Sequence, residues 1–452
     1  MDNRLSWIWL SLACGPASRT AVQLLCAFGS PEKIYRAPRE KLLAAVGERA
    51  RATVSRLENK DLSEASAVLR RSDEAGVTIL TPDDARYPRT LYALRDAPIV
   101  LYCAGRLPDL DSLCCCAVVG TRKMSEYGRR MAFDIGRGLG AGGAVLVSGL
   151  ALGVDGMAMA GALSAGGVTV GVLGCGIDIV YPPEHRDLWE RVLENGAVLT
   201  EYPPGTPPAG ANFPKRNRII SGLSQAVTVV EGDSRSGALI TARHALYQGR
   251  DLYAVPGQIG ESGAEGPNAL IKSGARAVTS AVDILAAYEF LYPHSIRMLS
   301  AEEELAREVS PGLVQDVAVR MRPAAKDDKM YYGIGLYGGR RLPEPGRRRI
   351  PQKKMVERFS AAEPPRNEGK MIASSEKQLD SLGENEKKVF AAMKPDMPML
   401  ADDIAAAGLD MPQILAALTM LELAGAVEVG AGGYYLRRAE EPLAESGADD
   451  AQ

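Results

Sequence analysis

The sequence is poor in the side chains that bind metal ions. Its three histidines, His185, His244 and His294, lie far apart along the chain. Its seven cysteines contain no C-x-x-C spacing, and three of them are consecutive at 114–116. A zinc site needs closely spaced Cys and His ligands, so we expect no metal site. Cysteines without a disulfide framework also fit a reducing cytosol.

Long hydrophobic runs are lacking as well. No stretch approaches the roughly 18 consecutive apolar residues that cross a membrane. Residues 5–14 are apolar, but the run is short and only Arg4 precedes it, close to Asp2. This is a poor secretion signal. We therefore expect a cytoplasmic protein that does not associate with membranes.

An excess of positive charge is also missing. The formal net charge is −3, with 46% apolar and 24% charged residues, which are ordinary globular values. A nucleic-acid partner would therefore have to be bound by a local basic patch. The length of 452 residues predicts two to four domains.

The common signatures of nucleotide enzymes do not occur. There is no G-x-x-x-x-G-K-[ST] run, and G-x-G-x-x-G does not follow the first strand of the predicted sheet. No Ser-His-Asp or Cys-His arrangement stands out. Asp155, Asp178, Glu201 and Glu231 could serve as acid or base, but two of them lie where carboxylates cap helices. We expect no catalysis and no cofactor.

What the sequence does contain is a regular alternation of strands and helices over residues 114–288. The strands are nearly all apolar, which is typical of a sheet covered on both faces. They are predicted at 114–119, 144–148, 168–173, 197–202, 226–230 and 251–255. The helices between them are predicted at 126–139, 155–164, 184–195, 215–223 and 237–248. We expect an α/β protein with a Rossmann-like, doubly wound, mostly parallel sheet within residues 76–288.

Two regions flank this sheet domain. Residues 1–75 show helical spacing of apolar residues, interrupted at Gly15-Pro16 and at Gly29-Ser30-Pro31, where Ser30 is placed to cap a helix. They predict a small helical domain, either a SAM or helix-hairpin-helix relative or a protein-contact module. Residues 381–438 predict a winged-helix-like domain, with helices followed by a β-hairpin. No Lys or Arg occurs between Asp402 and Tyr435, which argues against tight duplex binding.

The remaining segments are polar. Residues 320–358 carry twelve Lys or Arg against four Asp or Glu, mixed with Gly and Pro. We predict a basic, largely disordered linker over 289–380, which is either a solvated tether or an auxiliary nucleic-acid contact. Residues 439–452 predict an acidic tail.

Ligands of a doubly wound sheet bind at the carboxyl ends of its strands. The loops there read G-T-R-K-M-S-E-Y-G at 120–128, S-G-L-A-L-G-V-D-G at 148–156 and E-G-D-S-R-S-G at 231–237. Glycines before a helix form a cradle of backbone N–H groups that suits phosphates. The segment F-P-K-R-N-R-I-I-S-G-L-S at 213–224 follows the fourth strand, so it meets these loops. Alone it could be an ordinary amphipathic helix; placed here, its cations beside Phe213 favour single-stranded nucleic acid.

Taken together, these runs resemble the DprA/Smf family (DNA processing protein A). The resemblance rests on V-V-G-T-R, S-G-L-A-L-G-V-D, G-C-G-I-D-I-V-Y-P, F-P-K-R-N-R-I-I-S-G-L-S, S-G-A-L-I-T-A-R-H-A, A-V-P-G and G-P-N-A-L-I-K-S-G-A, which cover residues 76–288 densely. It implies a non-enzymatic protein that binds single-stranded DNA and helps to load the RecA recombinase in natural transformation and recombination. It also implies a homodimer.

The resemblance also implies which residues touch DNA. The contacts expected from the resemblance are Arg122, Gly149, Phe213, Lys215, Arg216, Asn217 and Arg218. Backbone N–H groups near Gly149, and those of Ser236 and Gly237, would add hydrogen bonds to phosphates, and Lys272 is a further candidate. The four cations Arg122, Lys215, Arg216 and Arg218 would neutralise phosphates, and Phe213 would stack on a base. Asn217 would either touch the strand or hold the loop. Lys272 would either join the rim or be a solvated helix lysine.

Two other functions remain open from the residues. A nucleotide phosphoribohydrolase on a similar core would carry P-G-G-x-G-T-x-x-E, and the nearest approach is A-V-P-G-Q-I-G-E-S at 254–262. A DNA-linked regulator would bind duplex or a protein through residues 384–438.

Overall fold

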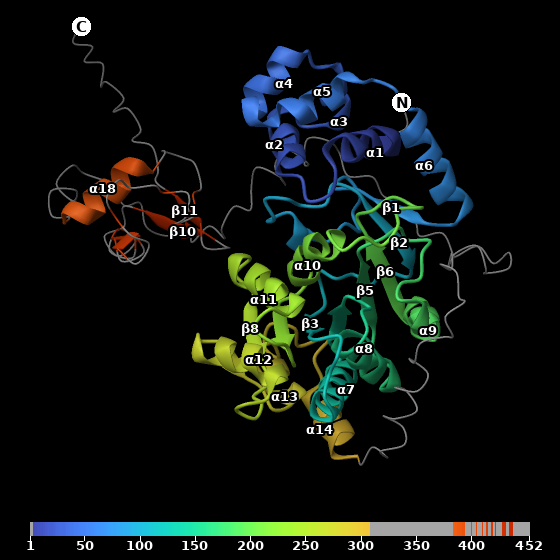
Figure 1. Cartoon of the computed structure of the whole chain (residues 1–452), viewed down its shortest axis with the longest axis vertical. Coiled ribbons are helices and arrows are strands. Elements are labelled where there is room, and N and C mark those ends of the chain that lie inside the picture. The colour runs from blue at the N-terminus through green and yellow to red at the C-terminus, as the bar shows by residue number, and fades with distance from the viewer. Residues whose placement is uncertain are drawn as a thin grey trace, which may run out of the picture. The chain divides into compact units, whose positions relative to one another are not determined.

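The computed structural model describes residues 3–307 and 383–393, together with 399, 404, 409, 413–414, 417–418, 421, 427–430 and 434–436. By contact density the chain divides into two compact units, Met1–Ala361 and Ala362–Gln452. The structure places the sheet and the helical head in the first unit (Figure 1). Most of the predicted linker and the acidic tail lie outside the described residues.

The helical head contains six α-helices and one short 3-10 helix among the residues that the structure describes. They are α1 (Asn3–Cys14), α2 (Arg19–Phe28), α3 (Pro31–Arg36), α4 (Arg39–Val46), η1 (Glu48–Ala50), α5 (Arg51–Glu58) and α6 (Ser63–Glu74). Ser30 caps α3 as predicted, because its side chain accepts a hydrogen bond from the Lys33 amide.

A nine-stranded sheet follows the head, and it is parallel except at one edge. Its strands are β1 (Thr78–Leu80), β2 (Leu101–Gly105), β3 (Cys115–Val119), β4 (Val145–Ser148), β5 (Thr169–Leu173), β6 (Gly196–Thr200), β7 (Ala226–Val229), β8 (Asp251–Ala254) and β9 (Arg276–Ala277). The order is β1-β2-β6-β5-β4-β3-β7-β8-β9. The six predicted strands are all present, and the pairs among β3 to β9 are parallel. β1 and β2 add an antiparallel edge to β6.

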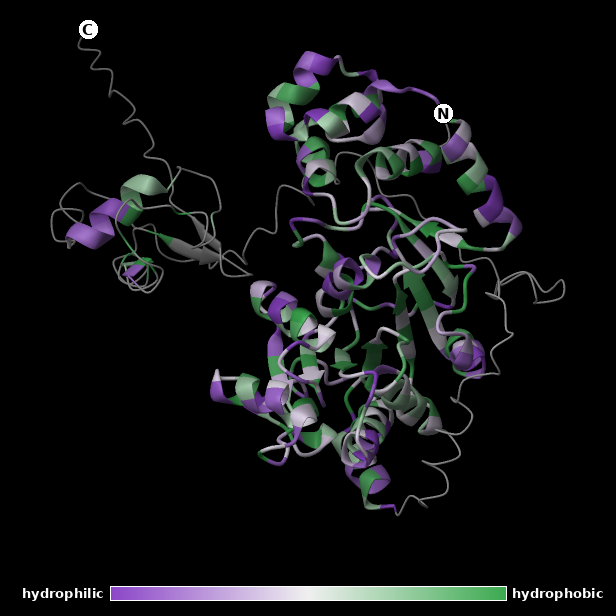
Figure 2. Cartoon of the chain, in the orientation of Figure 1, coloured by the Kyte–Doolittle hydropathy of each residue, from purple (hydrophilic) through white to green (hydrophobic). Residues whose placement is uncertain are grey.

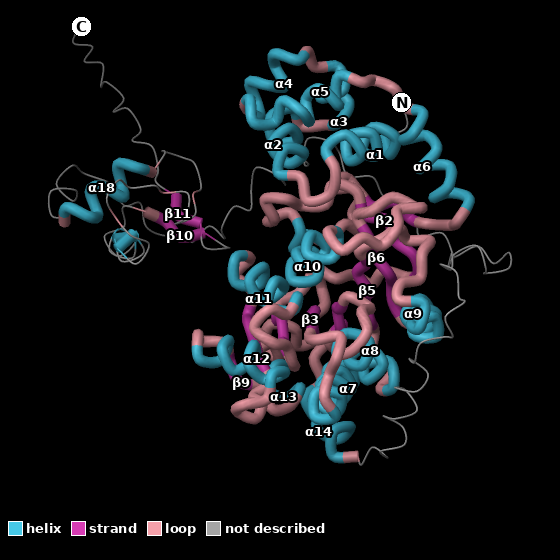
Figure 3. The backbone as a smooth tube through the Cα atoms, viewed as in Figure 1, coloured by secondary structure: helices cyan, strands magenta, loops and turns pink. Residues whose placement is uncertain are grey.

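Helices cover both faces of this sheet (Figure 3). They are α7 (Glu126–Ala141), α8 (Val154–Ser164), α9 (Arg186–Glu194), α10 (Asn212–Gly222), α11 (Gly237–Tyr247), α12 (Ser262–Lys272), α13 (Ala281–Leu285) and α14 (Met298–Ala306), with short 3-10 helices η2 (Arg89–Leu91) and η3 (Pro183–His185). Buried residues of α7, α8, α9 and α13 share one core, and those of α10 and α11 share another. Figure 2 shows the apolar strands between these two layers.

The consecutive cysteines illustrate how the sheet separates the two cores. Successive side chains of a strand point to opposite faces. Cys114 and Cys116 accordingly lie in the core with α7 and α8, whereas Cys115 lies in the core with α10 and α11. Burial raises the pKa of the Cys115 thiol, so it stays protonated and acts as a small apolar side chain.

The predicted linker over 289–380 contains an ordered segment, because residues 298–306 form α14. This helix packs against α7: Arg137 donates a hydrogen bond to the backbone oxygen of Glu304 at 2.6 Å. The sequence predicted disorder from the region as a whole, and the ordered piece is acidic rather than basic.

The second unit is described only in part. Helix α18 (Glu384–Ala392) and the antiparallel hairpin β10 (Glu428–Gly430) and β11 (Tyr434–Leu436) are present where predicted. Buried apolar side chains form its core: Val389, Met393, Met399, Ile404, Ile414, Ala417, Leu418, Leu421 and Val427. The two helices predicted between α18 and the hairpin fall largely outside the described residues.

Candidate functional site

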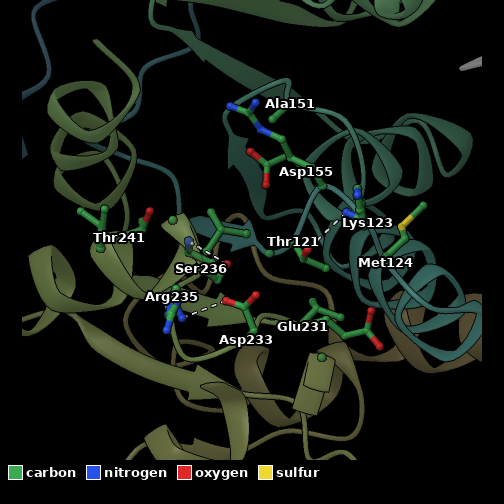
Figure 4. A pocket seen from close by; sticks show the side chains of 18 of the residues that line it. Thr121, Lys123, Met124, Ala151, Asp155, Glu231, Asp233, Arg235, Ser236 and Thr241 are labelled. Carbon is green, nitrogen blue, oxygen red and sulfur yellow. Dashed lines mark hydrogen bonds between the residues drawn. The ribbon is translucent and has the colours of Figure 1, made fainter. Parts of the chain in front are cut away.

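The carboxyl ends of β3 and β7 open into a cavity of about 1580 Å³. This is the switch point of the sheet, because β3 pairs with β4 on one side and with β7 on the other. The walls come from the loops after β3, β7 and β8 and from the start of α10. Figure 4 shows labelled residues of the loops after β3 and β7 on facing sides of the pocket. Pockets for small molecules measure about 300–1,000 Å³. The larger volume suits a segment of a longer ligand.

Phe213, in the first turn of α10, forms an aromatic wall of this pocket. The guanidinium carbon of Arg122 lies 5.2 Å from the centre of its ring, and that of Arg216 lies 5.8 Å away. The ring of Tyr181 packs against it at a centroid distance of 5.5 Å. Phe213 remains half-buried. The ring is thus fixed by two cations and a second aromatic side chain.

Arg216 lines the pocket as a buried side chain, with only 4% of its surface exposed. Its Nη1 donates hydrogen bonds to the backbone oxygens of Gly149, at 2.7 Å, and Val172. Burial lowers the pKa of Arg216, and the charge of Asp155 acts in the opposite direction. Burial likewise raises the pKa of Asp155 while Arg216 lowers it. These two charges therefore stabilise each other inside the protein.

Gly149 is needed for this packing rather than for an open phosphate cradle. Its N–H donates to the Asp155 carboxylate at 3.1 Å. A Cβ at this position would lie 2.6 Å from both Arg216 Nη2 and Asp155 Oδ2. The predicted ligand bond from this amide does not fit the structure, because Asp155 already occupies it.

Arg218 does not line the pocket. It is 1% exposed, and its Nη2 pairs with Glu201 at 2.5 Å. Asp96 lies 3.7 Å from its Nε. The expected phosphate contact does not match this position, because the guanidinium faces two carboxylates inside the protein.

The remaining predicted residues fall into three groups according to where they lie relative to the pocket. Lys215 and Lys272 are exposed but lie outside the pocket lining. Asn217 lines the pocket and bridges two helices: its Oδ1 accepts from Arg216 Nε at 3.2 Å, and its Nδ2 donates to the Gly237 oxygen at 3.3 Å. Ser236 caps α11 through the Ala238 amide at 3.3 Å, and Gly237 is exposed with open space beside it.

Three further lining residues were missed as site residues: Lys123, Tyr127 and Arg235. All three are exposed. They stand in the very loops that the sequence places after the first and fifth predicted strands, so their position could have identified them. Figure 4 shows Lys123 and Arg235 on different walls of the pocket. With Arg122 they give the pocket three exposed cations.

Four of the five carboxylates that line the pocket have local partners, and the fifth, Glu261, is exposed. Glu231, 7% exposed, accepts from the Ser125 amide at 2.8 Å and from its hydroxyl. Asp233 accepts from the Arg235 amide at 2.8 Å, and Glu126 pairs with Arg129 at 2.7 Å. Among the described residues that line the pocket there is no histidine or cysteine. The lining therefore offers cations and an aromatic wall rather than a nucleophile with its base.

One strained loop supports the pocket from the side. Leu150 has a φ of +54°, which is unusual for a residue other than glycine. Its carbonyl oxygen lies 2.9 Å from Nδ1 of the buried His185, which must therefore donate the proton. Ala151, the next residue, lines the pocket. His185 thus holds the loop in its conformation.

The described residues contain neither a membrane-spanning helix nor a cluster of metal ligands. None of their helices has the length and apolar character to cross a membrane. They also contain no group of three or more His, Cys, Asp or Glu side chains that could hold a metal ion.

The fold and the site define a Rossmann-like α/β protein with a cation- and aromatic-lined pocket at its switch point. Residues 78–289 match the family model of DNA recombination-mediator protein A, and residues 373–433 match the DprA winged helix domain. The chain belongs to the DprA/Smf family.

Individual relatives support this assignment. A putative DNA processing protein DprA from Mycobacterium tuberculosis is 34% identical over 354 residues, covering 73% of this chain and 87% of its own. Protein Smf of Escherichia coli is 46% identical over 213 residues, covering 47% of this chain and 57% of its own. The match thus spans little more than half of the Escherichia coli protein. The X-ray structure of DNA processing protein A from Streptococcus pneumoniae has a TM-score of 0.55 and 33% identity, covering 62% of this chain and 95% of that one.

Proposed function

We propose that the pocket at the ends of β3 and β7 binds single-stranded DNA. The observation that carries this proposal is the combination of three exposed cations, Arg122, Lys123 and Arg235, with the fixed ring of Phe213. Cations attract the phosphate backbone, and an aromatic ring stacks on bases of any sequence. A duplex keeps its bases paired and stacked inside, so only a single strand can present one to Phe213.

The proposal assigns different roles to the basic residues. Arg122, Lys123 and Arg235 neutralise phosphates, and Lys215 adds a contact outside the pocket. Arg216 and Asn217 hold the floor and the α10–α11 junction, since their polar groups bond mainly to the protein. Arg218 stabilises the fold through its ion pair with Glu201. The exposed backbone of Gly237 is open to a phosphate oxygen.

Membership of the family supports a wider role. We propose that the protein mediates DNA recombination, that it helps to load a RecA recombinase onto the bound strand, and that it acts as a homodimer. We also propose that it turns over no substrate, since Glu231, Asp233 and Glu126 are engaged with neighbouring groups and the described residues that line the pocket include no histidine or cysteine. Release of free base from a nucleoside monophosphate at enzymatic rates would instead support the phosphoribohydrolase alternative.

The test is a fluorescence titration of labelled oligo-dT and of a matched duplex at two salt concentrations. We expect the single strand to bind more tightly, and its affinity to fall steeply with salt, by a slope of about −0.7 for each phosphate neutralised. Equal binding of duplex and single strand would overturn the proposal.

A further inference from the structure

Tyr127 is an exposed aromatic side chain in the pocket, separate from the Phe213 wall. It stands in the first turn of α7, and 47% of its surface is accessible. Its hydroxyl donates a hydrogen bond of 2.8 Å to the backbone oxygen of Pro256, in the loop after β8. The ring is therefore held at its far end while a large part of it remains open to the pocket.

Both supports of this ring are themselves fixed. The first turn of α7 is tied to the end of β7, because Glu231 accepts from the amide and hydroxyl of Ser125. The loop after β8 is tied to α12, because Asn268 bonds to both the amide and the oxygen of Gly257, at 3.1 and 2.9 Å. An aromatic face that is held before a ligand arrives loses little conformational entropy on binding.

A polar side chain of the same pocket adds to the site. Gln258, two residues after Pro256, lines the pocket and is exposed. Its side-chain amide can both donate to and accept from the edge of a base. The exposed ring of Tyr127 and the side-chain amide of Gln258 match what an unpaired base needs: a stacking surface and a hydrogen-bonding partner.

We propose that Tyr127 and Gln258 form a second base-binding subsite. When one base of a single strand stacks on Phe213, this subsite binds another unpaired base of the same strand. This inference rests on the proposed function. The segment 122–127 connects the two sites. Arg122 contacts the Phe213 ring at its start, and Tyr127 lies at its end, in the first turn of α7. Arg122 and Lys123 therefore precede Tyr127 in a segment that starts at the Phe213 ring, so cations and two aromatic side chains line the same pocket, as a strand with alternating phosphates and bases requires.

The test compares oligo-dT with an abasic oligonucleotide of the same length, which keeps the phosphates but lacks the bases. Tyr127→Ala should lower the affinity for oligo-dT by roughly 5- to 150-fold, the loss expected for one base stack. It should leave the affinity for the abasic strand within about twofold. Tyr127→Phe keeps the ring and should bind oligo-dT within about threefold of the wild type. Tyr247→Ala, which removes a 60% exposed tyrosine outside the pocket, is the matched control.

The outcomes separate the alternatives. If Tyr127 only latches the loop, Tyr127→Phe and Tyr127→Ala lose affinity alike, for abasic and normal strands, and the subsite is refuted. Should Tyr127→Ala fail to fold, Tyr127→Trp provides a second measurement. Its added fluorescence should be quenched by oligo-dT but not by the abasic strand, and equal quenching by both refutes the subsite. If wild-type protein does not bind oligo-dT at all, the proposed function itself has failed.

Discussion

Arg218 and Glu201 form a buried ion pair, with Arg218 Nη2 2.5 Å from the carboxylate. Glu201 also accepts hydrogen bonds of 3.2 Å from the backbone amide of Ala17, in the loop between α1 and α2. This carboxylate, which follows β6, therefore links α10 to the helical head. Burial raises its pKa, and Arg218 opposes that shift. A residue that resembled a possible catalytic acid thus holds two parts of the fold together.

Replacing Glu201 should cost much stability. Glu201→Gln leaves the Arg218 guanidinium buried, with only the more distant Asp96 as a negative partner. Breaking a buried pair from one side costs about 3–5 kcal/mol. Urea unfolding should show a loss of this order, whereas Glu261→Gln, at an exposed position, should change stability by less than about 0.5 kcal/mol. Equal stability of the two variants would show that the pair contributes nothing.

The two neighbouring cations Lys215 and Arg216 should behave differently. Arg216→Ala removes the partner of Asp155 and of two backbone oxygens, so we expect a loss of about 3–5 kcal/mol in unfolding free energy. Lys215→Ala changes an exposed side chain and should fold like the wild type. Thermal or urea unfolding of both variants checks this. A stable Arg216→Ala protein would contradict the buried role and return Arg216 to the list of direct DNA contacts.

His185 should make stability depend on pH. Burial lowers its pKa below 6.5, so the unfolded chain binds a proton at pH values where the folded protein does not. The contribution of neutral His185 to the free energy of unfolding is complete above pH 6.5. It is lost as the pH falls from 6.5 toward the lower pKa that His185 has in the folded protein. The slope is at most about 1.4 kcal/mol per pH unit for one group.

Urea unfolding at pH 8 and pH 5.5 measures this effect. His185→Asn keeps an N–H that can donate to Leu150 but cannot titrate, so its loss of stability between the two pH values should be smaller than that of the wild type. Identical losses would mean that His185 does not contribute.

The sheet could be predicted from the sequence because both of its faces are buried, which leaves nearly continuous apolar strands at 114–255. The antiparallel edge was harder to assign, since apolar residues mark β1 and β2 as strands but do not show the direction in which they pair. The loops of the site followed from the strand order. Lys123 and Arg235 lay within those loops, but nothing in their own chemistry distinguished them from ordinary surface cations.

The burial of Arg216 and Arg218 could not be predicted. Sequence patterns place charged helix residues on the surface, because burial of a charge requires a partner. The partners here are Asp155, in the first turn of α8, and Glu201, which directly follows β6. Only the folded arrangement shows that these arginines face carboxylates rather than solvent.

The central claim, that the exposed cations of this pocket bind the phosphates of a single strand, is tested most directly by a salt titration. The variant Arg122→Ala, Lys123→Ala, Arg235→Ala is compared with Lys33→Ala, Lys41→Ala, Arg297→Ala, which removes three exposed cations elsewhere. We predict that the plot of log affinity for oligo-dT against log salt becomes shallower by about 2 for the pocket variant, at about 0.7 per phosphate contact, and stays unchanged for the control. Equal slopes and affinities for the two variants would contradict the account.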